Sequence, residues 1–255
     1  AVSRENIHKF TVNRAVAGSI LPGSIIRPFI FNRFTASDEY DNINIRPCNG
    51  ELLVGDTVLQ CYASHTDTSL YDMARSNCSI LFYQLGIAMG ISHIDNQLRE
   101  LFPGKITGID LPGESGYSVK HIDDKNLNAA LIGAGYSFIE MSAVMMTVLV
   151  NHTDRSSTPV VPSVTSKNLN NSAGVVDKNE QTGEFPFWIA DNIKHDAGFN
   201  GGVYSPSGER HGDNNILCGF ASSKTDDYIV MIILKSEDEI FTNMNIIAEY
   251  IRDEL

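Results

Sequence analysis

Apolar and polar positions follow the helical period in the first two thirds of the chain. Between residues 69 and 90 the apolar side chains recur about every 3.6 residues, which predicts a helix capped by Ser69. Residues 76–79 are rich in Ser and Asn, which compete for backbone hydrogen bonds, so we expect a break there. The Ala-, Met- and Val-rich stretch 129–150 predicts a further, buried helix.

The N-terminal part predicts a helix over residues 22–33 and a hairpin over residues 44–61. Pro22-Gly23 breaks the chain ahead of this helix. Ser24 is expected to be its N-cap, and Pro28 falls in the first turn, where a missing N–H costs little.

The pattern changes to extended segments near the C-terminus. Residues 216–221 and 228–234 predict two antiparallel strands, the second apolar on both faces and therefore central in its sheet. Residues 236–254 predict a closing helix, whereas the polar stretch 151–185 predicts loops. Helices combined with an antiparallel hairpin indicate an α+β domain.

Composition narrows the possible partners. The 255 residues are 42% apolar with a formal net charge of −12, which suits a folded domain and argues against nucleic acid or anionic lipid as partners. The chain has no run of 18 apolar residues, so the sequence predicts no membrane-spanning helix within it. The four cysteines include no CxxC pair, so we expect no metal and no cofactor.

Two cysteines flank the predicted hairpin. Cys48 precedes it and Cys61 ends it, so the two side chains are expected to face each other and are a candidate disulfide. Partly buried thiols are the alternative, and the sequence leaves both open.

Several local patterns occur in the order that one bacterial family shows. Asn13-Arg14-Ala15 comes before PGSIIRP at residues 22–28, and TGIDLPGE follows at residues 107–114. IGAG at residues 132–135 and Gly219-Phe220 complete the series. The chain thereby resembles the transpeptidase domain of class B penicillin-binding proteins, which are serine DD-transpeptidases related to β-lactamases. The resemblance implies an antiparallel sheet flanked by helices, with an additional helical lobe at about residues 66–150 of a single domain, 1–255.

The resemblance also implies positions for the catalytic residues. Ser24 stands at the position of the nucleophile, and Arg27 replaces the lysine that serves as the base. A guanidinium does not release its proton in a protein, so Arg27 is a poor base. The second motif, Ser-x-Asn in the family, falls on Asn77 and Ser79 with its polar ends exchanged.

The third motif, Lys-Thr-Gly in the family, matches best at Asn200-Gly201-Gly202, where substrate would bind. The lysine is therefore replaced there too. Three changed signatures beside intact scaffold patterns indicate a domain kept for its shape.

The implied role is a transpeptidase-like domain in peptidoglycan assembly, non-catalytic or weakly active, that acts as a scaffold or binds wall peptide. The alternative is an active, divergent DD-transpeptidase or carboxypeptidase that uses Ser24, with His65, His195 or His211 as candidate base. The implied partners are a peptidoglycan stem peptide or β-lactam and other wall-assembly proteins. The implied location is the outer face of the bacterial cytoplasmic membrane, through an anchor outside this chain.

Overall fold

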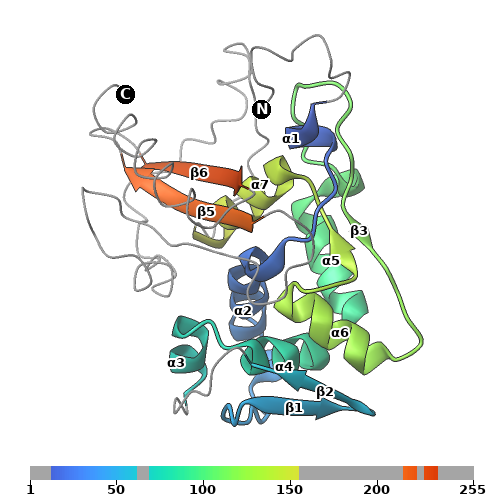
Figure 1. Ribbon diagram of the computed structural model, residues 1–255, viewed down its shortest axis with the longest axis vertical. Coiled ribbons are helices and arrows are strands. Elements are labelled where there is room, and N and C mark those ends of the chain that lie inside the picture. The colour runs from blue at the N-terminus through green and yellow to red at the C-terminus, as the bar shows by residue number, and fades with distance from the viewer. Residues whose placement is uncertain (1–12, 62–68, 155–214, 223–226, 235–255) are drawn as a thin grey trace.

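The computed structural model describes residues 13–61, 69–154, 215–222 and 227–234 (Figure 1). The helices are α1 (Arg14–Ala17), α2 (Arg27–Thr35), α3 (Leu70–Arg75), α4 (Ser79–Met89), α5 (Ile91–Leu101), α6 (Lys125–Ala134) and α7 (Ala143–Asp154). Short 3-10 turns are η2 (Gly23–Ile26), η3 (Asp38–Tyr40) and η4 (Pro103–Lys105). The strands are β1 (Glu51–Val54), β2 (Thr57–Gln60), β3 (Ser118–Val119), β4 (Ile139–Glu140), β5 (Asn215–Ser222) and β6 (Asp227–Leu234). The expected α+β class is confirmed.

The core is organised around the crossing of α4 and α6, whose backbones touch. A Cβ atom added to Gly133 would lie 2.6 Å from the Cα atom of Gly86, and one added to Gly86 would collide with the carbonyl oxygen of Ala129. Only glycine permits so close an approach. The crossing holds α4 and the end of α6 in place, and both of these segments contact the candidate site described below.

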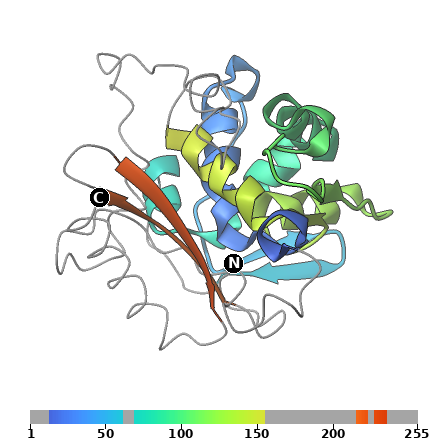
Figure 2. The ribbon, with the colours of Figure 1, turned by 90° about the horizontal axis from the view of Figure 1, so that it is seen from above.

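Helix α2 occupies the middle of the molecule, because its apolar side chains are buried from several directions. Phe29 and Ile30 are buried on it, and the helix packs against α4, α6 and α7. Figures 1 and 2 both place α2 between the β5–β6 pair and α6. A residue at the start of α2 is therefore surrounded by later elements of the chain.

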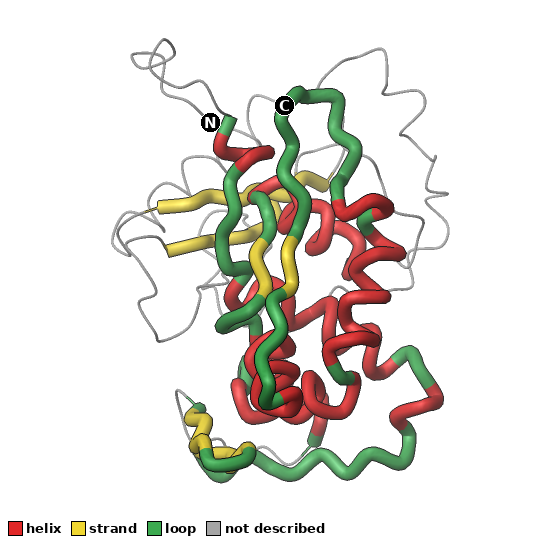
Figure 3. The backbone as a smooth tube through the Cα atoms, turned by 90° about the vertical axis from the view of Figure 1, so that its right-hand side faces the viewer, coloured by secondary structure: helices red, strands yellow, loops and turns green. Residues whose placement is uncertain are grey.

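The described strands form antiparallel pairs (Figure 3). β1 and β2 are joined at Gly55, whose φ of +58° suits glycine, and they make the predicted hairpin. β5 pairs with β6 from Asn215 opposite Leu234 to Ser222 opposite Asp227, which confirms the predicted C-terminal pair. The central position of the second strand in a wider sheet stays a prediction.

The stretch 129–150 contains helix as predicted, but in two pieces, the end of α6 and most of α7, because the chain turns in its middle. α6 ends at Gly135, which takes the left-handed conformation (φ 79°, ψ 13°), and Phe138 also has a positive φ of 65°. The short strand β4 follows before α7 begins. Glycine at this position stops a helix with little strain, and the apolar composition alone did not reveal the stop.

The predicted helix over residues 69–90 is interrupted where expected. α3 begins after Ser69, whose hydroxyl oxygen accepts a hydrogen bond from the N–H of Asp72 at 3.0 Å. The chain breaks at residues 76–78, where Asn77 has a φ of 52°, and α4 then begins at Ser79. The predicted helix over residues 236–254 and most of the loop stretch 151–185 lie outside the described residues.

Candidate active site

Ser24 does not cap a helix, so the expected N-cap role is wrong. It lies in the 3-10 turn η2, which leads directly into α2, and the N–H of Arg27 donates to its carbonyl oxygen. The whole residue is buried, with 0% exposed. Its position is fixed from outside the turn because Gly135 packs against the carbonyl group of neighbouring Gly23, where a Cβ atom would not fit.

Arg27 is fully buried as well, with 0% of its surface exposed. Its Nε donates to the carbonyl oxygen of Ala134 at 3.1 Å. Its Nη1 donates to the backbone oxygen and to Oδ1 of Asn77, at 2.6 and 2.9 Å, and its Nη2 donates to Oγ of Ser79 at 3.2 Å. The guanidinium thereby joins the first motif position, both ends of the second motif and the end of α6.

Two aromatic rings complete the surroundings of this guanidinium. Its Cζ lies 5.1 Å from the ring centroid of Phe82 and 5.2 Å from that of Tyr136. Cations within about 6 Å of an aromatic centroid are attracted by the ring quadrupole. The hydrogen bonds and the rings together keep a charged group in a dry interior, where it would otherwise be costly.

The second motif position is shaped by the break between α3 and α4. The left-handed backbone at Asn77 turns both its carbonyl and its side-chain oxygen to the same guanidinium. Asn tolerates this conformation better than most residues. Ser79, also buried, shares a hydrogen bond of 2.7 Å with the Tyr136 hydroxyl. Sequence reasoning missed Tyr136, although it directly follows the IGAG pattern.

The TGIDLPGE stretch forms a closed loop away from this centre. One carboxylate oxygen of Glu114 accepts from the N–H of Thr107 at 2.7 Å, and the other accepts from the N–H of Gly108 at 3.0 Å. Ser115 then donates through its N–H to the carbonyl oxygen of Val16 at 3.0 Å. Glu114 therefore closes the stretch on itself, and the residue directly after it connects the stretch to α1.

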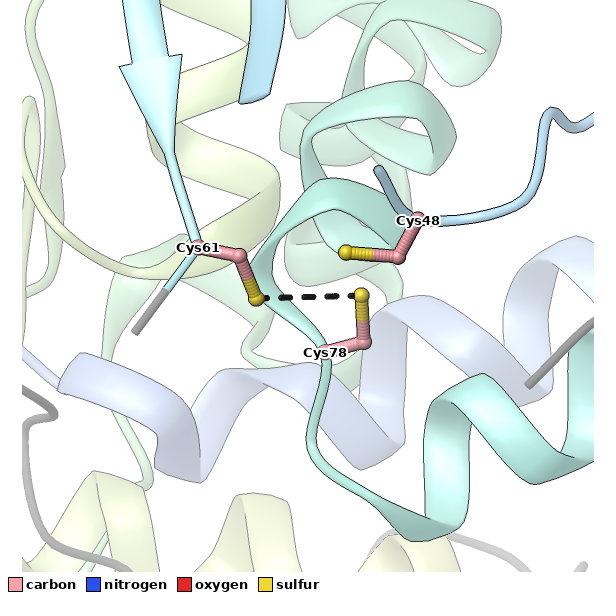
Figure 4. Close-up of side chains that lie close together, drawn as sticks. All are labelled: Cys48, Cys61 and Cys78. Carbon is pink, nitrogen blue, oxygen red and sulfur yellow. Dashed lines mark hydrogen bonds between the residues drawn. The ribbon is translucent and has the colours of Figure 1, made fainter. Parts of the chain in front are cut away.

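The hairpin cysteines meet a third cysteine. Cys48 and Cys61 lie together as expected, but among the described residues they are thiols and no disulfide joins them. The Sγ of Cys61 lies 3.9 Å from the Sγ of Cys78, and the three sulfur atoms lie within 4.8 Å of one another (Figure 4). The hydrogen bond with Cys61, followed by burial, raises the pKa of the Cys78 thiol well above its usual range.

The remaining predicted site residues lie outside the described residues. These are Asn200, Gly201 and Gly202 of the third motif, together with the candidate bases His65, His195 and His211. The centre that is described thus contains a serine, a protonated guanidinium and a Ser–Tyr hydroxyl pair. A serine hydroxyl has low intrinsic reactivity as a nucleophile, and a guanidinium does not accept a proton.

Comparison with known proteins gives agreement in structure and none in sequence. No family model matches the chain, and no curated protein matches it. A peptidoglycan glycosyltransferase from Burkholderia ambifaria superposes with a TM-score of 0.66 at 13% identity, over 89% of this chain and 75% of that one.

Two further solved structures agree in the same way. PBP2 from Helicobacter pylori, solved in complex with MreC, gives a TM-score of 0.67 at 15% identity, over 92% of this chain and 50% of that one. PBP3 from Mycobacterium tuberculosis, complexed with aztreonam, gives 0.59 at 18% identity, over 91% and 60%. This chain therefore spans about half of the Helicobacter chain, and it has the fold that these penicillin-binding proteins share.

Proposed function

We propose that this chain is a transpeptidase-like domain of bacterial peptidoglycan assembly that is non-catalytic or weakly active, and that it acts as a scaffold or binds wall peptide. The fold supports the first part, because its structural neighbours include two penicillin-binding proteins and a peptidoglycan glycosyltransferase. One observation supports the second part: Arg27, which the family resemblance puts at the position of the base, is fully buried.

The contacts of Arg27 exclude it from proton transfer. A base must accept the serine proton, but in its hydrogen bonds with Ala134, Asn77 and Ser79 the guanidinium is the donor. Guanidinium groups stay protonated in proteins. Losing general-base assistance typically costs about 10² to 10⁴ in rate. Acylation at Ser24 is therefore expected to be very slow.

The burial of Ser24 adds a second obstacle. A nucleophile must approach the carbonyl carbon of its substrate within about 3–3.5 Å before it attacks. With 0% of Ser24 exposed, a substrate reaches its hydroxyl only after neighbouring atoms move. The same packing suits a rigid scaffold, because buried and fully bonded groups define one conformation.

The proposed partners and location follow from the neighbours. The Helicobacter protein is complexed with MreC and the Mycobacterium protein with aztreonam. For this chain we propose wall-assembly proteins as partners, with a stem peptide or β-lactam as the ligand.

We also propose that the chain lies outside the cytoplasmic membrane, held by an anchor beyond this chain. Within the described residues no helix is long and apolar enough to cross a membrane. The single domain with a helical lobe at residues 66–150 belongs to the same proposal.

The test is the intact mass of the protein after exposure to a penicillin. We expect no adduct, because within the part of the chain that the structure describes neither a base nor an open path serves Ser24. Ser24→Ala is the matched control. An adduct on the unchanged protein that disappears in Ser24→Ala would show an active, divergent enzyme and overturn the proposal.

The converse variant restores the lysines of the family pattern. Arg27→Lys combined with Asn200→Lys supplies a group that can lose its proton at position 27 and a cation at the third motif position. If the missing base is what limits acylation, this double variant forms more penicillin adduct than the unchanged protein. Equal reactivity of the two would show that Arg27 does not limit the reaction.

A further inference from the structure

Three cysteine side chains from separate segments converge on one point (Figure 4). Cys48 precedes β1, Cys61 follows β2, and Cys78 directly precedes α4. Their Sγ atoms lie within 4.8 Å of one another, with 3.9 Å between those of Cys61 and Cys78. Cys48 is 6% exposed and Cys78 is 0% exposed, so the cluster lies at the edge of the core.

We propose that Cys48, Cys61 and Cys78 form a three-thiolate site for a zinc ion. Zinc binds cysteine sulfur at about 2.3 Å with tetrahedral geometry, which places any two sulfur ligands about 3.8 Å apart. The separation of 3.9 Å between Cys61 and Cys78 already matches this edge. Three protein ligands leave the fourth position for an exogenous donor such as water, an arrangement that zinc commonly has in proteins.

Backbone contacts hold the ligands in place without the ion. The N–H of Cys61 donates to the carbonyl oxygen of Gly50 at 2.8 Å, so the two ends of the hairpin stay together. The N–H of Cys78 donates to the carbonyl oxygen of Met73 at 2.9 Å, across the break between α3 and α4. A zinc ion would therefore bind a largely formed site and would release the thiol protons on binding.

A disulfide explains this arrangement less well than a metal does. A disulfide uses two sulfur atoms about 2.05 Å apart and leaves the third cysteine without a role. Hydrophobic packing of thiols requires no shared centre. The convergence of all three sulfur atoms is what a soft divalent cation needs, since thiolates are its preferred ligands.

The ion would connect two parts of the fold. Cys78 lies between Asn77 and Ser79, which both accept hydrogen bonds from the guanidinium of the candidate site. A metal bound to Cys78 would tie this segment to the β1–β2 hairpin. The inference does not depend on whether the domain is catalytic, because it rests on the thiols alone.

The test uses the full chain, freed of metal with a chelator under reducing conditions and then given Zn²⁺ alone. After desalting, we expect one zinc ion per chain by elemental mass spectrometry. With Co²⁺ we expect the thiolate-to-cobalt charge-transfer band. Cys48→Ser, Cys61→Ser and Cys78→Ser should each weaken binding by more than the roughly 10- to 100-fold that loss of an outer partner costs. Cys218→Ser, in strand β5, is the matched control and should bind as the unchanged protein does.

A second measurement needs no variant and therefore no refolded mutant. The unchanged native protein is alkylated with iodoacetamide, with and without Zn²⁺, and the modified cysteines are identified by peptide mass. Zinc should protect Cys61, which is the partly exposed cysteine of the three. Absence of stoichiometric zinc uptake, equal uptake by the triple Cys→Ser variant, or equal alkylation of Cys61 with and without zinc would each overturn the proposal. A Cys61–Cys78 disulfide in the purified chain, with no zinc uptake after reduction, would identify a redox pair instead.

Discussion

Arginine at position 27 gives the candidate site different physical properties from those that lysine would give it. Lysine is a flexible point charge that can be deprotonated, whereas arginine is a planar fork of donors. Arg27 uses that fork on acceptors from two segments, the end of α6 and the break before α4. Arg27 is therefore a structural connection between these two segments.

The first prediction concerns this connection. Arg27→Met removes the donors while keeping an unbranched apolar stem, so oxygens of the buried residues Ala134 and Ser79 and of the half-buried Asn77 lose a partner. Each unsatisfied buried group costs about 1–3 kcal/mol, and we expect the free energy of unfolding to fall by about 3 kcal/mol or more. Urea denaturation measures it.

The control for this prediction is Arg99→Met on α5. Arg99 is 54% exposed and makes an ion pair with Asp95 in the same helix at 2.7 Å. Exposed pairs contribute about 0–1 kcal/mol, so this variant should remain close to the unchanged protein. Similar losses in both variants would show that the buried hydrogen bonds contribute little.

Among the elements, the crossing of α4 and α6 depends on the absence of side chains. Gly86 and Gly133 face each other there, and a Cβ atom on either would meet backbone. Tyr136 and Gly135 follow α6 directly, so the spacing of the two helices also sets how the candidate site is closed.

The second prediction is a loss of stability where helix propensity alone would give a gain. Replacing a helical glycine with alanine ordinarily stabilises a helix by about 1 kcal/mol. Gly86→Ala and Gly133→Ala should instead lower the thermal midpoint, because the helices must move apart. Asn96→Ala, at an exposed position of α5, is the control and should be neutral or slightly stabilising. Stabilisation by Gly86→Ala would contradict the close contact.

The limits of sequence reasoning are visible at the same elements. The interruption after α3 was predictable, because Ser69 and the Ser/Asn cluster act on neighbouring residues. The stop at Gly135 was missed, since the apolar pattern continues through it. The meeting of Cys78 with the hairpin cysteines was missed because it depends on how distant elements pack, and no local spacing encodes that.

At the scale of the whole molecule, the order of weak local patterns predicted the fold at 12–18% identity to solved relatives. The order of these patterns is informative even where the overall sequence identity is low, because each pattern marks a turn or contact that the architecture requires. The same reasoning could not supply the third motif position or a bound ligand. The net charge of −12 is a property of the whole chain. Its carboxylates repel one another, and this repulsion weakens when some of them are protonated.

The third prediction concerns stability in acid. Burial alone would raise the pKa of Asp95, but hydrogen bonds from Arg99 and Tyr117 outweigh it and hold that pKa below its usual value. A depressed carboxyl pKa stabilises the folded state above the unfolded value of about 3.9. That stabilisation is lost as the pH falls below it. The free energy of unfolding should therefore decrease below about pH 4, and Asp95→Asn should reduce this dependence. Urea titrations across that range measure it, with Asp56→Asn on the hairpin as control; equal effects would contradict the assignment.

The buried guanidinium also has an evolutionary consequence, because it makes arginine at position 27 difficult to replace. A lysine placed at position 27 cannot fill the acceptors that Arg27 now satisfies. A path that begins by placing a lysine at position 27 therefore begins with a less stable protein. Selection for folding alone opposes that step, so arginine is retained at position 27 whether or not the domain is catalytic.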